Sequence, residues 1–189
     1  MRLKKVSKVS IIIVFLACIL SVFYFNSKTI MFSSNMDKGI DNYWNDKVSI
    51  KEVKDFEVYG KKFKLVLSTP INNEKYKYLN CYEEKMNGLY YKSYRAAEQG
   101  ESNSLFTFST IFVNDVVDSS KENYFTIVYG YNKDSEVVSY EIKVSEQEKS
   151  IVSNVSSKEY FIDAFKGHIQ DIVKVIGEDG NDKIKVFED

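Results

Sequence analysis

The chain contains a single histidine, His168, which limits the catalytic chemistry that the sequence can support. One imidazole cannot build a metal site of two or three histidines, and a catalytic triad would have to use this residue. The sharpest enzymatic hypothesis pairs it with Cys81, because a thiol needs a neighbouring base to become a thiolate near neutral pH. Nothing in the sequence brings the two together, so a core cysteine and an exposed histidine are the favoured interpretation and no catalytic residue is assigned.

Carboxylates suggest two further hypotheses. Asp163 and Asp171 could act as general acid and base, as in glycoside hydrolysis, but a chain with 27 acidic residues also produces such pairs by chance. A second acidic group could offer oxygen ligands to Ca²⁺, which prefers them. It lacks the spaced pattern of a calcium loop, so a hairpin turn is predicted there, and no metal or cofactor is expected. The residues of this group are Glu178, Asp179, Asn181 and Asp182.

The chain also contains 14 tyrosines, enough to line a binding surface for a glycan or a protein. They are densest between residues 76 and 94. We take Tyr78, Tyr82, Tyr90 and Tyr91 as a weak candidate binding patch. At least half of these rings must pack internally, because the neighbours Tyr90 and Tyr91 point to opposite faces of a predicted strand.

Alternating β-branched and aromatic residues dominate the chain from Lys47 onward, which is typical of half-buried strands. Turn residues separate these strands about every ten positions. The pattern predicts a mainly β (α+β) fold, an antiparallel sheet or sandwich. Hairpins are predicted for 56–58 with 63–67 around Gly60, for 125–131 with 138–144, and for 172–176 with 184–187, and a long strand for 106–112.

One helix is predicted to pack on this sheet, between Asn72 and Gly88. Asn72 or Asn73 can cap its first N–H groups, and Gly88 allows a left-handed end. Apolar residues recur between them at spacings of three and four, namely Tyr78, Leu79, Tyr82 and Met86. The stretch 157–165 fits either a second helix or a strand, and a strand is preferred.

Residues 9–27 contain no charged side chain. A helix of this length rises about 28 Å, close to the hydrocarbon thickness of a bilayer, so a single transmembrane helix (a signal anchor) is predicted. The cytoplasmic stub before it, residues 1–8, is basic, which places the N-terminus in the cytoplasm and the bulk of the chain outside. A polar tether, 28–46, then leads to an extracytoplasmic β-rich domain, 47–189. The basic residues of the stub are Arg2, Lys4, Lys5 and Lys8.

Two other interpretations of the apolar segment remain open. A basic start followed by an apolar run also begins a cleavable signal peptide, although this run is longer than the usual signal core and no small-residue cleavage site follows it. Residues 15–18 loosely resemble the lipobox of bacterial lipoproteins, which would make Cys18 a lipidation site. Phe15 and the apolar continuation after Cys18 depart from that pattern, so a buried membrane thiol is favoured.

Charge and cysteine usage narrow the choice of partners. The chain has 26 basic and 27 acidic residues, and removing the four basic residues of 1–8 leaves 22 basic residues and a formal charge of −5 outside. This charge argues against nucleic acid as a partner. Only Cys81 lies in the exported part, so its core must hold it together without an internal disulfide.

The layout resembles that of the small single-pass surface proteins of Gram-positive bacteria, a resemblance that covers the layout alone. The expected function is therefore a membrane-anchored binding domain in a bacterial cell envelope, with an envelope protein or a glycan as partner. One alternative is an envelope enzyme that uses Cys81, or a carboxylate pair, with His168. Another is an accessory subunit of a membrane complex.

Overall fold

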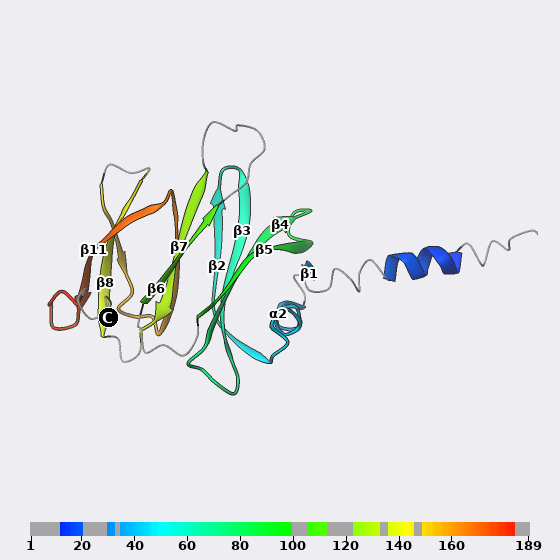
Figure 1. Cartoon of the computed structure of the whole chain (residues 1–189), viewed down its shortest axis with the longest axis horizontal. Helices are drawn as coiled ribbons and strands as arrows, with labels where there is room; N and C mark the ends of the chain where they lie inside the picture. Colours follow the sequence, from blue (N-terminus) through cyan, green and yellow to red (C-terminus); the bar gives the residue numbers. More distant parts are fainter. Residues whose placement is uncertain are drawn as a thin grey trace, which may run out of the picture.

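Strands and one helix follow each other from Ile30 onward in the computed structural model (Figure 1). The structure describes residues 12–20, 30–32, 35–99, 106–112, 123–132, 136–145 and 149–183. The elements are β1 (Ile30–Phe32), α2 (Met36–Trp44), β2 (Val48–Val58), β3 (Lys61–Pro70), β4 (Lys77–Lys85), β5 (Tyr90–Gln99), β6 (Phe106–Phe112), β7 (Tyr124–Tyr131), β8 (Val137–Val144), β9 (Ile151–Asn154), β10 (Tyr160–Lys166) and β11 (Ile169–Gly177).

The strands form three antiparallel sheets. Sheet A has five strands in the order β1-β5-β4-β3-β2. Sheet B has the order β10-β7-β6, and sheet C has the order β11-β8-β9. The predicted mainly β architecture with antiparallel sheets is therefore confirmed.

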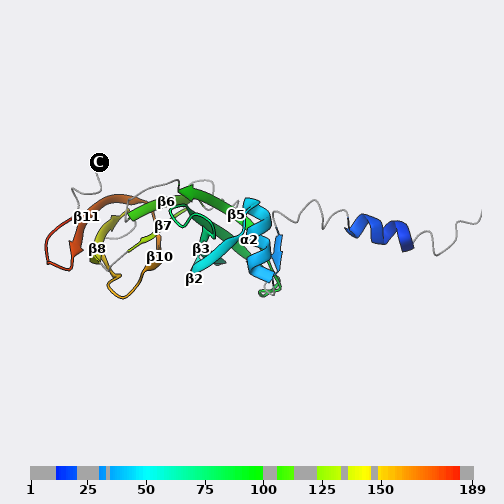
Figure 2. The same ribbon diagram turned by 90° about the horizontal axis from the view of Figure 1, so that it is seen from below.

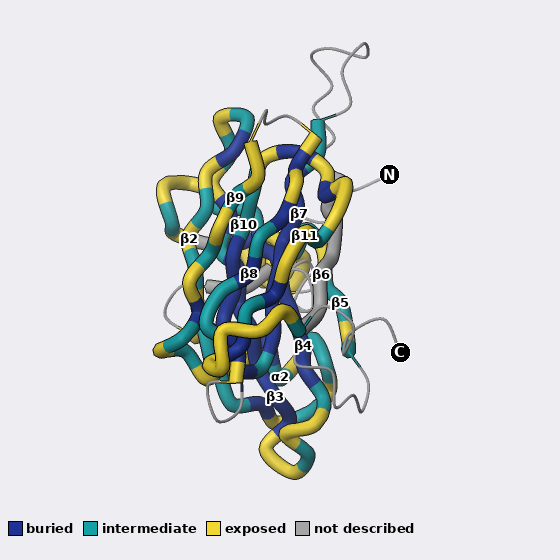
Figure 3. The backbone as a smooth tube through the Cα atoms, turned by 90° about the vertical axis from the view of Figure 1, so that its left-hand side faces the viewer, coloured by how far each residue is buried: buried dark blue, intermediate teal, exposed yellow. Residues whose placement is uncertain are grey.

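The three sheets are stacked, with sheet B in the middle (Figures 1 and 2). Alternate residues of β7 point to opposite sides, and both sides are buried. Phe125 and Ile127 pack against Leu65 of sheet A, whereas Val128 packs against Ile142 of sheet C. Buried residues therefore run along the middle strands β7 and β10 (Figure 3).

Helix α2 covers the outer face of sheet A. Ile40 is fully buried there against Val66, and the Trp44 ring stacks on Tyr78 with 4.3 Å between ring centroids. The Trp44 indole N–H also donates a hydrogen bond of 2.8 Å to Asn80. This differs from the expected polar tether, since residues 28–46 contribute both α2 and the edge strand β1. The physical reason is the apolar stripe of α2, where Met36, Ile40 and Trp44 recur every four residues.

The helix predicted between Asn72 and Gly88 is wrong, because β4 occupies this segment. Strand β4 lies inside sheet A and is buried on both faces. Tyr78 and Tyr82 pack toward α2, whereas Leu79 and Cys81 pack toward sheet B. Such a strand carries no alternation of polar and apolar residues, and its apolar run then also fits a helical spacing.

Residues 125–131 and 138–144 form strands as predicted, β7 and β8, but the predicted hairpin pairing is wrong. Strand β7 pairs with β6 and β10, whereas β8 pairs with β9 and β11. The chain leaves sheet B at Asn132, whose buried side-chain amide donates to the carbonyl oxygens of Val137 (2.8 Å) and Val155 (3.0 Å). Its oxygen accepts the Val137 N–H at 2.9 Å. These bonds hold a corner that carries the chain into sheet C.

Three other strand predictions are confirmed. Strands β2 and β3 form the hairpin around Gly60, whose φ of 71° suits glycine. The preferred strand in 157–165 is β10, and the strand at 106–112 is β6. The partner strand predicted at 184–187 lies outside the described residues.

Residues 12–20 form a helix whose side chains are all exposed. The large apolar side chains among them are 36–66 % exposed. Of the predicted span 9–27, the flanking residues lie outside the described part of the chain. Among the residues that the structure does describe, none of the helices combines the length and apolar character needed to cross a bilayer.

Candidate functional site

The tyrosines of the predicted patch lie mainly in the packing layer between sheet A and α2. Tyr78, Tyr82 and Tyr91 are buried, in one cluster with Ile40. The backbone of Tyr90 pairs with Phe32 of β1, and its side chain is outside what the structure describes. The three buried rings are therefore packing residues in this structure, and α2 is the element that covers them.

Cys81 lies in the middle of β4, buried between sheets A and B. Burial, followed by the charge of Glu83, raises the pKa of its thiol far above the ordinary value. A thiol with a raised pKa stays protonated at neutral pH, whereas a cysteine acts as a nucleophile in its deprotonated, thiolate form. Cys18, the candidate lipidation site, is exposed on the helix of residues 12–20.

We predict that Cys81 does not react with thiol reagents in the folded protein. The experiment uses the Cys18→Ser chain, in which Cys81 is the remaining thiol. At pH 8, reaction with an aromatic disulfide should fall at least 100-fold below that of the same chain in denaturant, because the sulfur is inaccessible and protonated. A fast reaction of the folded chain that is lost in His168→Ala would instead place the two residues in one site.

His168 is exposed in the turn between β10 and β11. Its backbone N–H donates to the Ser145 hydroxyl at 3.0 Å, and its ring lies edge-on to Tyr124. Asp171 is exposed on β11, beside Lys143 in register. Asp163 is buried in β10, and its hydrogen-bond partners include neither Asp171 nor His168.

The acidic segment after β11 is the predicted turn. Asp179 accepts the Asn181 N–H at 3.0 Å and pairs with Lys183 at 2.6 Å. Asp182 accepts the Val175 N–H at 3.1 Å. These oxygens therefore stabilise the turn itself. Within the described ranges, no group of three or more histidine, cysteine or acidic residues could hold a metal ion.

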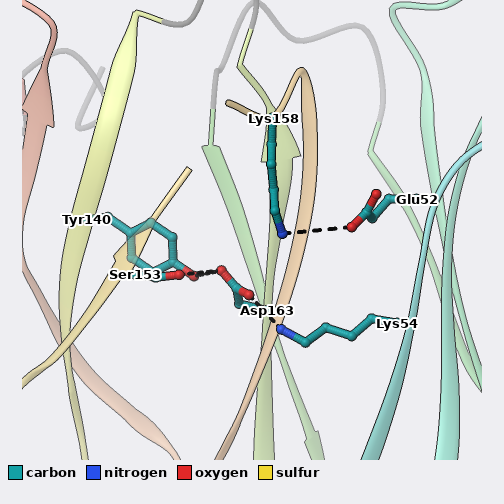
Figure 4. A network of polar contacts seen from close by, with 6 residues as sticks. All are labelled: Glu52, Lys54, Tyr140, Ser153, Lys158 and Asp163. Carbon is teal, nitrogen blue, oxygen red and sulfur yellow. Dashed lines mark hydrogen bonds and ion pairs between the residues drawn. The ribbon is translucent and has the colours of Figure 1, made fainter. Parts of the chain in front are cut away.

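Asp163 is the centre of a polar network that joins all three sheets (Figure 4). One of its oxygens accepts from the Lys54 ammonium of β2 at 2.6 Å. The other accepts from the Tyr140 hydroxyl of β8 at 2.7 Å and from the Ser153 hydroxyl of β9 at 2.6 Å. Beside it, Lys158, which lies just before β10, pairs with Glu52 of β2 at 3.8 Å. This ion pair is a second polar contact between β2 and the segment that contains β10.

The pKa shifts of Asp163 and Tyr140 keep the carboxyl ionised and the hydroxyl neutral at neutral pH. Burial alone would raise the pKa of Asp163, but hydrogen bonds from Lys54, Ser153 and Tyr140, together with the Lys54 charge, lower it. Burial raises the pKa of Tyr140, and the carboxylate beside it raises it further. An ionised Asp163 whose two oxygens both accept hydrogen bonds is a poor proton carrier. The network therefore connects the three sheets.

Sequence reasoning missed the partners of Asp163, although β10 carries a signal. Phe161 and Phe165 are apolar on the face that also carries Asp163, and Tyr160, Ile162 and Ala164 are apolar or aromatic on the other, so both faces are expected to be buried. Asp163 is the one acidic residue in that strand. A carboxylate in a strand buried on both faces needs a buried partner, which predicts a network of this kind.

Two of the most exposed apolar side chains of the domain lie in one turn. Met86 is 70 % exposed and Leu89 is 57 % exposed, and both belong to the four-residue turn between β4 and β5. Met86, Asn87 and Gly88 all have positive φ angles, of 51°, 54° and 81°. A methionine in this conformation is uncommon, and it is held here by a tight hairpin.

The described residues define a β-rich α+β domain of three stacked sheets, with a separate apolar helix ahead of it. Comparisons of the chain with protein-family models, with curated proteins and with solved structures found no match. The class of protein is therefore defined here by this chain's own residues and geometry.

Proposed function

We propose that the chain is a single-pass membrane protein whose β-rich domain lies outside the cytoplasm and binds a protein or glycan of the cell envelope. The observation that carries this proposal is the helix of residues 12–20, which is apolar on every side and exposed. A helix with no polar face has no stable place in water, whereas a lipid environment satisfies it. This helix lies inside the charge-free segment 9–27. The eight residues before that segment include four basic residues and no acidic residue.

The chemistry of the domain favours binding over catalysis by the residues discussed above. The Cys81 thiol is buried and protonated, and both oxygens of Asp163 are engaged by hydrogen bonds. The stack of three sheets provides a rigid support, which suits a surface that must hold its shape for a partner. The formal charge of −5 outside the basic stub favours a partner with basic or neutral groups.

A reporter fusion tests the location. Alkaline phosphatase joined after Asp189 and produced in a bacterium should be active, because this enzyme works only outside the cytoplasm. Replacing Arg2, Lys4, Lys5 and Lys8 with glutamate should reduce that activity at least several-fold, because the charge difference across the span orients it. An inactive phosphatase, together with an active β-galactosidase at the same position, would overturn the proposal.

Exchanging the predicted span for another one tests whether the partner is bound by the domain or by the span. An unrelated transmembrane helix of equal length in place of residues 9–27 should leave the activity of the exported reporter unchanged. It should also leave unchanged the crosslinks that the domain forms with envelope components in intact cells. Loss of those crosslinks with normal export would favour an accessory subunit that docks through its span.

A further inference from the structure

We infer that the β4–β5 turn is a second membrane contact, with Met86 and Leu89 inserted into the headgroup region of the outer leaflet. This inference rests on the proposed function, because it requires the chain to cross the bilayer just before β1. The ligand is the phospholipid boundary itself, where headgroups meet acyl chains.

Chain length places this turn close to the lipid. Strand β1 begins at Ile30, three residues after Ser27, the last residue of the charge-free segment. An extended chain covers at most about 3.6 Å per residue, so Ile30 lies within about 11 Å of the hydrocarbon edge. The headgroup region itself is about 5–8 Å thick on each side. The start of the domain is therefore at the level of the headgroups or directly above them.

Strand pairing brings the turn to the same place. Ile30 pairs with Lys92 and Phe32 pairs with Tyr90, the residue that directly follows Leu89. Strand β1 and the β4–β5 turn accordingly lie at the same end of the domain (Figure 1). The other end of β4 leads into the β3–β4 connection, which holds the exposed Ile71 among polar residues.

The composition of the turn suits a lipid boundary. Two large exposed apolar side chains lie within one four-residue turn, whose backbone has three consecutive positive φ angles. Burying both of them in the lipid boundary would be favourable, and the span already holds the domain beside the bilayer. Both signs of charge flank the turn, since Lys85 pairs with Glu83 and Lys92 lies in register with the same Glu83, so the two exposed apolar side chains are the feature that suits a lipid boundary.

This contact would orient the whole domain. Sheet A would lie next to the lipid, and sheet C, at the opposite end of the stack, would point away from it (Figure 1). A partner would then meet sheet C, where the edge strand β9 carries the exposed Val152.

Tryptophan placed at the two ends of the domain tests this inference. The full chain is reconstituted in phosphatidylcholine vesicles with brominated acyl chains, which quench tryptophan at short range. Leu89→Trp should be quenched at least twofold more strongly than the control Val152→Trp, which starts from an apolar residue on β9 that is at least as exposed, at 67 % against 57 % for Leu89. The native Trp44 stays packed on Tyr78 in both variants and gives the same background.

Alkaline carbonate extraction of the same vesicles separates the two possible failures. Equal quenching of both variants in a chain that resists extraction would overturn the membrane contact and leave the span intact. Release of the chain by carbonate would overturn the span itself, and the membrane contact with it. Retention of the chain with selective quenching of Leu89→Trp supports both.

Discussion

Replacing Asp163 with alanine is expected to lower the free energy of unfolding by about 3 kcal/mol. The substitution removes the acceptor of three hydrogen bonds that come from β2, β8 and β9. It leaves the buried hydroxyl of Tyr140 without its carboxylate, whereas Lys54, whose side chain is 35 % exposed, can turn to solvent. Urea unfolding of the full chain in mild detergent, followed by circular dichroism, measures the change.

An exposed carboxylate provides the matched control. Asp55 pairs with Lys64 on the surface, with its side chain 77 % exposed, so Asp55→Ala should cost less than about 1 kcal/mol. Asp163→Asn should fall between the two, because it keeps the shape and one acceptor and loses the charge. Equal effects of Asp163→Ala and Asp55→Ala would show that the network does not hold the sheets together.

The stabilisation from Asp163 should also depend on pH in a defined direction. The folded state lowers the pKa of this carboxyl, so the stabilisation is fully present above the unfolded-state pKa of about 4. It is lost as the pH falls through the lower pKa of the folded state. The difference in unfolding free energy between the natural chain and Asp163→Asn should therefore be constant from pH 5 to 8 and shrink below pH 4.

Sequence patterns predicted the strands well where one face is polar or a turn residue is distinctive. The β2–β3 hairpin follows from Gly60 and the alternation on either side of it. The prediction of a helix in place of β4 is wrong because β4 is central in sheet A and covered on both faces. Burial on both faces removes the alternation on which a strand prediction depends. The period of a pattern reports burial on one face, and a strand buried on both faces has no such period.

The order of the sheets could not be predicted from local pattern. Strands β7 and β8 are neighbours in sequence and were expected to pair, yet they lie in different sheets. The contact of Lys54 with Asp163 spans 109 positions and exists only because sheets A and B are stacked with β2 beside β10. Tertiary packing decides such contacts: the apolar residues around Asp163 indicate that it needs a buried partner, but they do not indicate which residue that partner is.

The candidate tyrosine patch shows a related limit. The local sequence does not show whether a tyrosine ring is exposed for binding or buried in packing, and this holds for Tyr78, Tyr82 and Tyr91. Their burial depends on α2, which lies in residues 28–46, the segment that the sequence predicts to be a polar tether. The apolar spacing of Met36, Ile40 and Trp44 was available in the sequence and would have predicted both the helix and the covered face beneath it.

The second large effect on the free energy of unfolding is expected at Asn132, the residue at the corner between sheets B and C. Asn132→Asp keeps the size of the side chain but replaces its N–H₂ donor with an oxygen, which then faces the carbonyl oxygens of Val137 and Val155. The new carboxylate would be buried, since Asn132 is almost fully inaccessible, and the hydrogen bonds described for this side chain bring no cation to it. We expect a loss of about 4 kcal/mol or more in unfolding free energy at pH 7, measured by urea unfolding.

Asn154→Asp is the matched control, because the same chemical change there should be nearly neutral, within about 0.5 kcal/mol. The Asn154 oxygen accepts from the backbone N–H and the hydroxyl of Ser156, and a carboxylate accepts both equally well. In Asn132→Asp, burial should raise the carboxyl pKa in the folded state, so the loss of stability should lessen as the pH falls and the group takes up a proton. Both losses of stability therefore shrink at low pH, but the pKa shifts behind them are opposite: the folded state lowers the carboxyl pKa of Asp163 in the natural chain and raises that of the carboxyl introduced at position 132. Similar small losses for both asparagine variants would mean that the Asn132 hydrogen bonds do not hold the corner between sheets B and C.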